Sequence, residues 1–262
     1  MDKNWIWFSR INKIGAKTQK NLLERYNTPE KIWKLKKEEL QKNNFLNEEQ
    51  IKIILENGYR ENLQLYEEFM KKKNIKMITI RDKEYPNKLR NIYDPPVVLF
   101  AMGNIEILNE PSIAIIGSRM CSEYGKNIAR QFAYNLSKHN INIISGLAKG
   151  IDTYAHFGAI SANKKTIAVI GSGLDVIYPK ENVSIAEKIV QSNGAIISEY
   201  IVGTRPERMN FPARNRIISG LSDGVLVVEA NRKEWNFYYC RFCNREWKEY
   251  LCNSRRYKQK HF

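Results

Sequence analysis

Apolar runs that alternate with helical patterns are the feature that most constrains the fold of this 262-residue chain. Five such runs lie between residues 113 and 228, and helical periodicity separates each from the next. Continuous runs rich in Ile and Val are typical of strands buried on both faces, and their alternation with helices predicts a mostly parallel, doubly wound α/β sheet. With two earlier runs, the expected strands are 77–80, 97–100, 113–116, 141–144, 166–170, 195–198 and 225–228.

The first 75 residues carry only helical signals. Apolar positions recur at helical spacing, and turn or capping residues such as Gly15, Pro29 and Gly58 separate them. The pattern predicts a small all-helical domain over 1–75, followed by a sheet domain over 76–230. The segment from Ile14 to Thr18 looks like the turn of a helix-hairpin-helix unit, which would hold DNA phosphates through backbone N–H groups. An ordinary glycine turn between two helices is the alternative.

Three of the expected strands end in glycine and serine ahead of a helical pattern. The turns are Gly117-Ser118-Arg119, Ser145-Gly146 and Gly171-Ser172-Gly173. The backbone N–H groups of such a turn, together with the positive end of a helix dipole, converge on one point and bind anions. Along a parallel sheet the turns line the crevice outside the carboxyl ends of the strands, where we expect phosphate. The G-x-G-x-x-G spacing of an ordinary dinucleotide site is absent after the strand at 113–116.

The formal net charge of +15 indicates a polyanionic partner such as nucleic acid. No apolar run approaches the roughly 20 residues of a membrane-spanning helix, and the N-terminus has no signal-peptide pattern, which predicts a cytoplasmic protein with no membrane partner. The charge is uneven, because residues 231–262 contain nine Lys and Arg against three Glu and so carry +6 of the total.

Residues 231–262 also differ in composition from the rest of the chain. They contain no Gly, Pro, Ala, Val or Ile, and they hold three of the four cysteines. A metal or redox site built on Cys240-x-x-Cys243 with Cys252 and His261 is one interpretation, but a single C-x-x-C motif is a weak signal. We favour a frameshift near Lys233.

Read one nucleotide later from A/T-rich codons, this tail can encode an N-capped helix, a turn and a strand ending in Pro-Gly. Without those elements the sheet would end at residues 225–228 and expose apolar surface.

Several specific strings surround the glycine turns. They are Tyr85-Pro86-x-x-Leu89, Asp94-Pro95-Pro96-x-x-Leu99, Gly117-Ser118-Arg119, Ser145-Gly146-Leu147-Ala148-x-Gly150-Ile151-Asp152-x-x-Ala155-His156, Gly173-Leu174-Asp175-x-x-Tyr178-Pro179 and Phe211-Pro212-x-Arg214-Asn215-Arg216. In order and spacing these strings resemble the DNA-processing protein A (DprA/Smf) family. The resemblance is strong from Tyr85 to Ala230 and loose over the N-terminal helices.

The resemblance implies a Rossmann-like domain preceded by a helical domain similar to a sterile alpha motif. It further implies a protein that is not an enzyme, binds single-stranded DNA, forms a homodimer, protects incoming strands in naturally transformable bacteria and helps to load RecA onto them. Neither a cofactor nor a metal is expected. After Ala230 the family continues with a Ser-Gly-(Ser/Thr) turn, a helix and a strand ending in Pro-Gly, which the shifted frame restores.

Arginines near the turns are the main candidates for contact with DNA. Arg119 can place its planar guanidinium on a phosphate. Arg214 and Arg216 can hold successive phosphates if their segment is extended, and ion pairs with Glu199 or Glu229 are their alternative. The expected DNA- or phosphate-binding residues are Gly117, Ser118, Arg119, Ser145, Gly146, Gly150, Ser172, Gly173, Lys180, Phe211, Arg214, Asn215 and Arg216.

Phe211 and Lys180 each have a second interpretation. The Phe211 ring can stack on a base or pack in the core, and Lys180 can contact phosphate or remain solvated. Asp152 and His156 stand four residues apart at the start of an expected helix and could form a catalytic pair, but no further group completes a site.

Two other classes of function stay open on the sequence alone. One is a nucleotide-binding enzyme similar to nucleoside-monophosphate phosphoribohydrolases, although their Pro-Gly-Gly-x-Gly-Thr loop is absent here. The other is a binding module whose partner is a protein.

Overall fold

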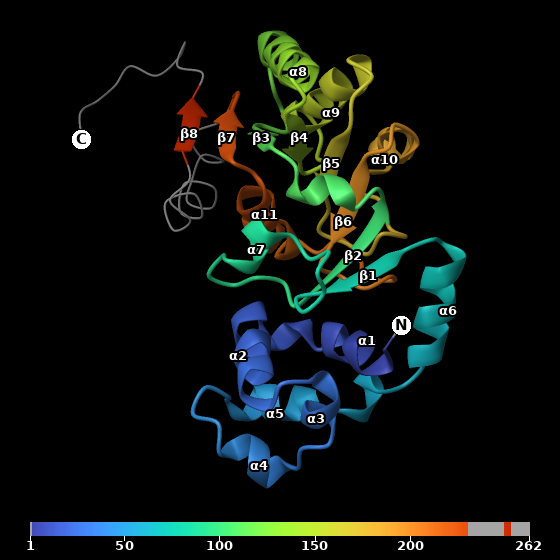
Figure 1. Cartoon of the computed structure of the whole chain (residues 1–262), viewed down its shortest axis with the longest axis vertical. Helices are drawn as coiled ribbons and strands as arrows, with labels where there is room; N and C mark the ends of the chain where they lie inside the picture. The colour runs from blue at the N-terminus through green and yellow to red at the C-terminus, as the bar shows by residue number, and fades with distance from the viewer. Residues whose placement is uncertain (1, 230–248, 253–262) are drawn as a thin grey trace, which may run out of the picture.

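A computed structural model of the chain describes residues 2–229 and 249–252. Its centre is an eight-stranded mixed sheet in the order β1-β2-β6-β5-β4-β3-β7-β8, and the N-terminal helices pack below that sheet in the view of Figure 1. Within the described residues, no helix is both long enough and apolar enough to cross a membrane.

All seven strands expected from the sequence are present. They are β1 (Lys76–Thr79), β2 (Val98–Gly103), β3 (Ser112–Ile116), β4 (Asn142–Ser145), β5 (Thr166–Val169), β6 (Ala195–Ser198) and β7 (Gly224–Val227). Strands β3 to β7 pair in parallel, whereas β2 is antiparallel to both β1 and β6. The prediction of a mostly parallel, doubly wound sheet is confirmed.

An eighth strand, β8 (Glu249–Cys252), pairs in parallel with β7. The expectation that the sheet ends at residues 225–228 is therefore wrong, because the outer backbone groups of β7 face a further strand. The frameshift near Lys233 and the Cys240-x-x-Cys243 motif lie outside the described residues, and both stay predictions.

Helices cover both faces of the sheet. One face carries α8 (Glu123–Lys138), α9 (Ile151–Ser161) and α10 (Val183–Gln191), and the other carries α7 (Asn87–Arg90) and α11 (Asn210–Leu221). Ile115 of β3 packs with α8 and α9, while its neighbours Ala114 and Ile116 pack with α11. The strand is thus buried on both faces, as its continuous apolar sequence predicts.

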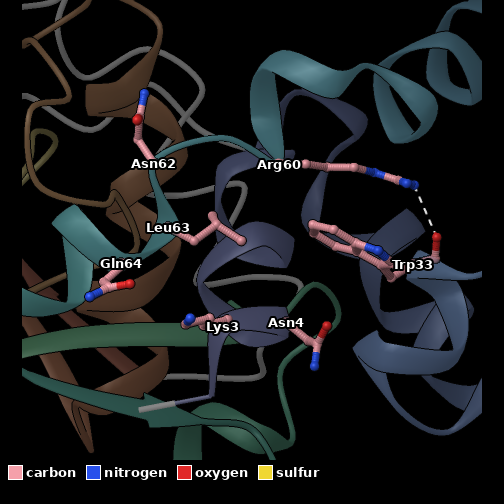
Figure 2. A pocket seen from close by; sticks show the side chains of 7 residues that line it. All are labelled: Lys3, Asn4, Trp33, Arg60, Asn62, Leu63 and Gln64. Carbon is pink, nitrogen blue, oxygen red and sulfur yellow. Dashed lines mark hydrogen bonds between the residues drawn. The ribbon is translucent and has the colours of Figure 1, made fainter.

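The described helices before β1 are α1 (Lys3–Arg10), α2 (Ala16–Tyr26), α3 (Pro29–Trp33), α4 (Lys37–Gln41), α5 (Glu48–Leu55) and α6 (Leu63–Lys72). Their apolar residues belong to the same buried cluster as residues of the sheet domain, including Phe100 and Val202. Arg60, between α5 and α6, lies over the ring of Trp33 (Figure 2).

Within the segment from Ile14 to Thr18, Gly15 separates a 3-10 helix that ends at Ile14 from α2. Gly15 has φ +87° and precedes α2, and the Lys17 ammonium lies 4.6 Å from the centroid of the Tyr93 ring. That the segment from Ile14 to Thr18 contacts DNA stays a prediction.

Parallel pairing brings the loops after β3, β4, β5 and β6 to one edge of the sheet, which we call the carboxyl edge. From β3 to β6 the chain proceeds along the sheet in one direction, and β7 then lies on the opposite side of β3. Open α/β sheets bind ligands at such a switch point. The loop from Gly117 to Arg119 and Glu229, two residues after the end of β7, therefore lie where a ligand would be expected.

Candidate nucleic-acid interface

The predicted site residues divide into an accessible and a buried group. Arg119 and Lys180 are exposed, and Gly117, Gly150, Phe211 and Asn215 are half-buried. The buried residues are Ser118, Ser145, Gly146, Ser172, Gly173, Arg214 and Arg216.

A carboxylate of the chain itself occupies the switch point. The Glu229 side chain accepts hydrogen bonds from the N–H (3.0 Å) and the hydroxyl (2.8 Å) of Ser122, at the N-terminus of α8. Its main-chain carbonyl accepts a further bond from the N–H of Ser118 (2.6 Å). A side chain at Gly125 would collide with this carboxylate. Glu229 thus supplies the negative charge that the helix dipole favours, and it uses the Ser118 amide that was expected to contact phosphate.

The turn after β4 closes on a second internal carboxylate. Asp152, in the first turn of α9, accepts hydrogen bonds from the N–H groups of Gly146 (3.1 Å) and Ala148 (3.4 Å). Burial raises the pKa of Asp152, while the charge of Arg214 and the two amides act in the opposite direction. The anion-binding geometry of this turn is real, but its occupant is a side chain of the protein. The expectation that Gly146 contacts phosphate is corrected accordingly.

Arg214 and Ser145 are tied to the ends of strands. One terminal nitrogen of Arg214 donates to the carbonyls of Gly146 (2.7 Å) and Val169. The Ser145 hydroxyl donates to the carbonyl of Ile115 (2.6 Å). Both side chains are at most 3% exposed, so they link neighbouring strands of the sheet and are not offered to a ligand.

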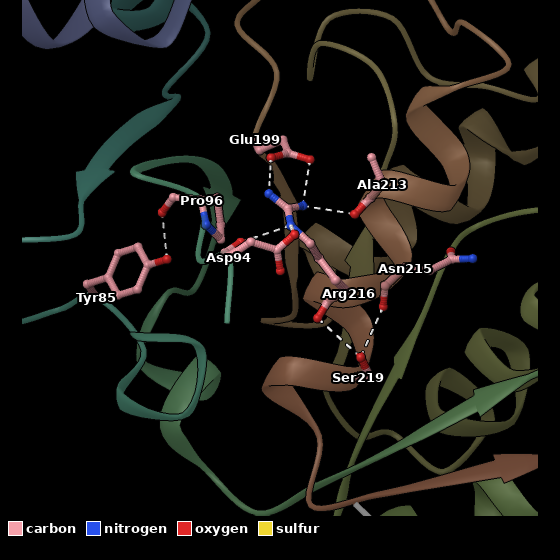
Figure 3. Close-up of polar contacts among 8 residues, drawn as sticks. All are labelled: Tyr85, Asp94, Pro96, Glu199, Ala213, Asn215, Arg216 and Ser219. Carbon is pink, nitrogen blue, oxygen red and sulfur yellow. Dashed lines mark hydrogen bonds and ion pairs between the residues drawn. The ribbon is translucent and has the colours of Figure 1, made fainter. Parts of the chain in front are cut away.

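Arg216 is the centre of a buried ion-pair network (Figure 3). Its terminal nitrogens reach the two carboxylate oxygens of Glu199 at 2.9 and 2.6 Å, and its Nε donates to the carbonyl of Asp94 at 2.9 Å. Burial opposes the charge, but the carboxylates of Glu199 and Asp94 outweigh it and raise the pKa of Arg216. At 4% exposure this guanidinium has no surface to present to DNA.

The idea that Arg214 and Arg216 grip successive phosphates is therefore wrong. It required an extended segment, whereas both residues lie within helix α11 and both are buried. The alternative, an ion pair with Glu199, is confirmed for Arg216. The side-chain oxygen of Asn215 accepts a bond from Nε of Arg214 (3.3 Å), which connects this third residue to the same interior.

Arg119, Tyr178 and Phe211 meet at the carboxyl edge, and we call them the edge cluster. The guanidinium carbon of Arg119 lies 5.3 Å from the centroid of the Phe211 ring. The Phe211 and Tyr178 centroids are 5.8 Å apart, with 44° between the ring planes. Tyr178 is 47% exposed and Arg119 is exposed as well. A cation beside two accessible rings can contact a phosphate and an adjacent base at once.

The turn after β5 holds the edge cluster in position. The side-chain amide of Asn210 donates to the carbonyl of Gly171 (3.1 Å), and a Cβ at Gly171 would touch the Phe211 ring. The Ser172 hydroxyl donates to the carbonyl of Val176 (2.6 Å), within the loop that carries Tyr178. Ser172 therefore supports the loop from inside.

The remaining predicted residues have simpler surroundings. The N–H of Gly173 donates to the carbonyl of Thr204 (2.9 Å), which joins the loops after β5 and β6. Gly150 has φ +78° and packs against the backbone of the loop after β3, where a side chain would collide. Lys180 is exposed, and the nearby Lys149 pairs with Glu181 at 2.6 Å.

His156 and Asp152 do not form an accessible catalytic pair. His156 has no exposed surface, and its Nδ1 lies 2.8 Å from the Thr166 hydroxyl. Burial, with a smaller effect of the Arg214 charge, lowers the pKa of His156 to about 3. A neutral imidazole packed against a strand is a structural group.

Sequence reasoning missed four accessible residues at this edge. Tyr178 belongs to one of the strings that resemble the family, but its contact with Phe211 appears only in the tertiary structure. The other three follow β6 and are exposed: Arg205, Arg208 and Met209. Their placement depends on the parallel pairing of β5 with β6, which motif spacing does not reveal.

A family model described as DNA recombination-mediator protein A matches residues 76–260. The Protein Smf of Synechocystis sp. is 37% identical over 246 residues, which cover 92% of this chain and 61% of that protein. The DNA processing protein DprA of Streptococcus pneumoniae is 46% identical over 162 residues, which cover 62% of this chain and 57% of that protein. The chain thus spans about three fifths of the length of these relatives.

Two solved structures are similar to this one. DNA processing protein A of Streptococcus pneumoniae aligns with a TM-score of 0.73 and 32% identity, over 96% of this chain and 86% of that one. DNA processing protein A of Helicobacter pylori, whose structure was described for its single-stranded DNA binding mode, aligns with a TM-score of 0.62 and 31% identity, over 68% and 80%. The resemblance inferred from the sequence strings is confirmed.

Proposed function

This chain belongs to the DNA recombination-mediator protein A family, and we propose that it binds single-stranded DNA along the carboxyl edge of its sheet. The edge cluster is the observation that carries the proposal. Arg119 contacts a phosphate, and the rings of Tyr178 and Phe211 stack on bases, which every sequence offers. The single-stranded DNA binding mode described for the Helicobacter pylori relative supports the choice of ligand.

The surroundings of the edge cluster favour a strand over a small anion. Lys180, Arg205 and Arg208 are exposed on the adjoining loops, so positive charge extends along the edge. Two places with anion-binding geometry, the N-terminus of α8 and the turn after β4, are occupied by the carboxylates of Glu229 and Asp152. A ligand at this edge therefore binds mainly to side chains on the rim, which suits a flexible polyanion.

The wider role belongs to the same proposal. The chain takes part in DNA processing during natural transformation, in the cytoplasm, where it protects incoming strands and helps to load RecA. It acts as a homodimer and as a binding protein, not as an enzyme. The names of the curated relatives, which describe DNA processing, support this role.

A binding titration tests the proposal. Oligo-dT should bind more tightly than blunt duplex of equal length, and log K should fall against log salt by about 0.7 for each phosphate contact. Equal affinity for duplex, or no salt dependence, would contradict it. Tight binding of a nucleoside monophosphate with no affinity for oligo-dT would favour the enzyme interpretation instead.

A further inference from the structure

A hollow of about 370 Å³ adjoins the carboxyl edge on the side of the N-terminal helices. Leu65 and Phe69 of α6 line one side, and Asp175 and Gly203, from the loops after β5 and β6, line the other. Leu65 is 61% exposed and Phe69 is 38% exposed. The Asp175 carboxylate accepts the N–H of Gly203 at 2.8 and 3.0 Å, so hydrogen bonding already engages the one acidic side chain of this hollow.

A second hollow, of about 530 Å³, adjoins the first. Asn62, just before α6, lines both hollows. Lys3 and Asn4 of α1 lie on one side, and Arg60 lies over Trp33 on the other (Figure 2). The first hollow therefore lies beside the loops after β5 and β6, and the second lies within the helical part of the molecule.

The second hollow is cationic. The Arg60 guanidinium lies 4.5 Å from the centroid of the Trp33 ring and 5.6 Å from that of Trp7, and one terminal nitrogen donates to the Trp33 carbonyl at 3.0 Å. Its Nε is buried and finds no hydrogen-bond acceptor within the described part of the chain. Neither Asp nor Glu is among the residues that line this hollow, whereas Lys3 adds a second positive charge. Such a lining favours a phosphate group.

We propose that a single strand bound at the carboxyl edge continues past Phe69 and ends with a phosphate in the hollow between Lys3 and Arg60. This inference rests on the proposed function. Two features single out a continuing strand over a free phosphate or nucleotide. The two hollows adjoin at Asn62, and the exposed ring of Phe69 lines the hollow that lies next to the edge, where a base can stack on it.

The test compares oligo-dT of about 4 and about 16 nucleotides, the range of single-strand site sizes, using the whole chain. Lys3→Gln removes one cation of the second hollow, and Lys42→Gln, an exposed lysine on the N-terminal helices outside both hollows, is its control. Phe69→Ala removes the ring, and Phe132→Ala, 44% exposed on α8, is its control.

For the long oligonucleotide we expect Lys3→Gln to reduce the salt slope by about 0.7, and Phe69→Ala to weaken binding by about five-fold or more. Neither variant should change binding of the short oligonucleotide, and neither control should change either. Long-oligonucleotide binding equal to that of the wild type in both variants would overturn the inference, and so would equal losses for the two lengths. If the wild type binds neither length, the proposed function itself fails. Should Phe69→Ala prove unstable in thermal unfolding, Lys3→Gln decides the matter alone.

Discussion

Arg216 and Arg119 lie at the same edge of the sheet, but their surroundings differ completely. Arg216 is 4% exposed and pairs with both oxygens of Glu199, whereas Arg119 is exposed and lies against the Phe211 ring. We call Asp152, Glu199, Arg214 and Arg216 the inner layer, and the edge cluster with Lys180 the outer rim. The inner layer balances its charges internally, and the outer rim leaves positive charge available to a partner.

The comparison shows that an anion-binding motif need not bind an external anion. The N-terminus of α8 and the glycine turn after β4 direct amide groups at a negative charge, and the carboxylates of Glu229 and Asp152 provide that charge. The Ser118 amide, in the glycine turn after β3, donates to the main-chain carbonyl of Glu229. The residues that remain accessible come from loops whose proximity depends on strand order. We therefore assign DNA binding to Arg119 and stability of the fold to Arg216, although both arginines lie at the same edge.

The largest expected effect follows from breaking the inner layer. Arg216→Ala leaves Glu199, whose side chain is only 13% exposed, without its cation, so the free energy of unfolding should fall by about 3–5 kcal/mol. Chemical denaturation measures it, and Arg205→Ala, an exposed arginine after β6, should stay within about 0.5 kcal/mol of the wild type. A loss below about 1 kcal/mol for Arg216→Ala would mean that the network contributes little to the fold.

The next effect concerns the buried imidazole behind the inner layer. The pKa of His156 falls from about 6.5 to about 3 on folding because the ring is buried, so between these values the unfolded chain binds a proton that the folded chain does not. Stability should therefore decrease by about 1.4 kcal/mol for each pH unit below about 6.5. Denaturation of His156→Asn at several pH values should show a shallower dependence on pH. A slope identical to that of the wild type would contradict the assigned burial.

The outer rim should respond in affinity and not in stability. Tyr178→Ala removes an accessible ring, and we expect the free energy of oligo-dT binding to weaken by about 1–3 kcal/mol, with unfolding nearly unchanged. Tyr134→Ala, on α8 and 38% exposed, is the matched control. Unchanged affinity in Tyr178→Ala would leave Phe211 as the sole stacking residue of the edge cluster.

Much of this fold could be predicted from the sequence, because a strand that is buried on both faces has a continuous apolar sequence. The runs at 113–116 and 225–228 are apolar at successive positions and became β3 and β7. The residues of the candidate site were harder to predict than the strands. Arg119 is exposed, as its predicted contact with phosphate requires, and that contact stays a prediction. Nothing local to Arg216 distinguishes a phosphate contact from an ion pair with Glu199. Glu199 lies 17 residues away in sequence and meets Arg216 only through the packing of α11. Tyr178 and Phe211 likewise lie side by side only in the tertiary structure.

The tail at 231–262 stays a prediction, even though the family match extends to residue 260. Removing one nucleotide near the Lys233 codon should open a reading frame that encodes Ser-Gly-Thr and, later, Pro-Gly. Resequencing this part of the gene checks it. If no such frame exists, a basic tail that carries cysteines becomes the better interpretation.

The division of roles between the two layers is tested most directly by the salt dependence of oligo-dT binding in Arg119→Ala. The slope of log K against log salt should lose about 0.7, the contribution of one phosphate contact, while thermal unfolding stays that of the wild type and Arg130→Ala, exposed on α8, changes neither. An unchanged slope, or a marked loss of stability in Arg119→Ala, would show that this arginine serves the fold and that the DNA contacts lie elsewhere.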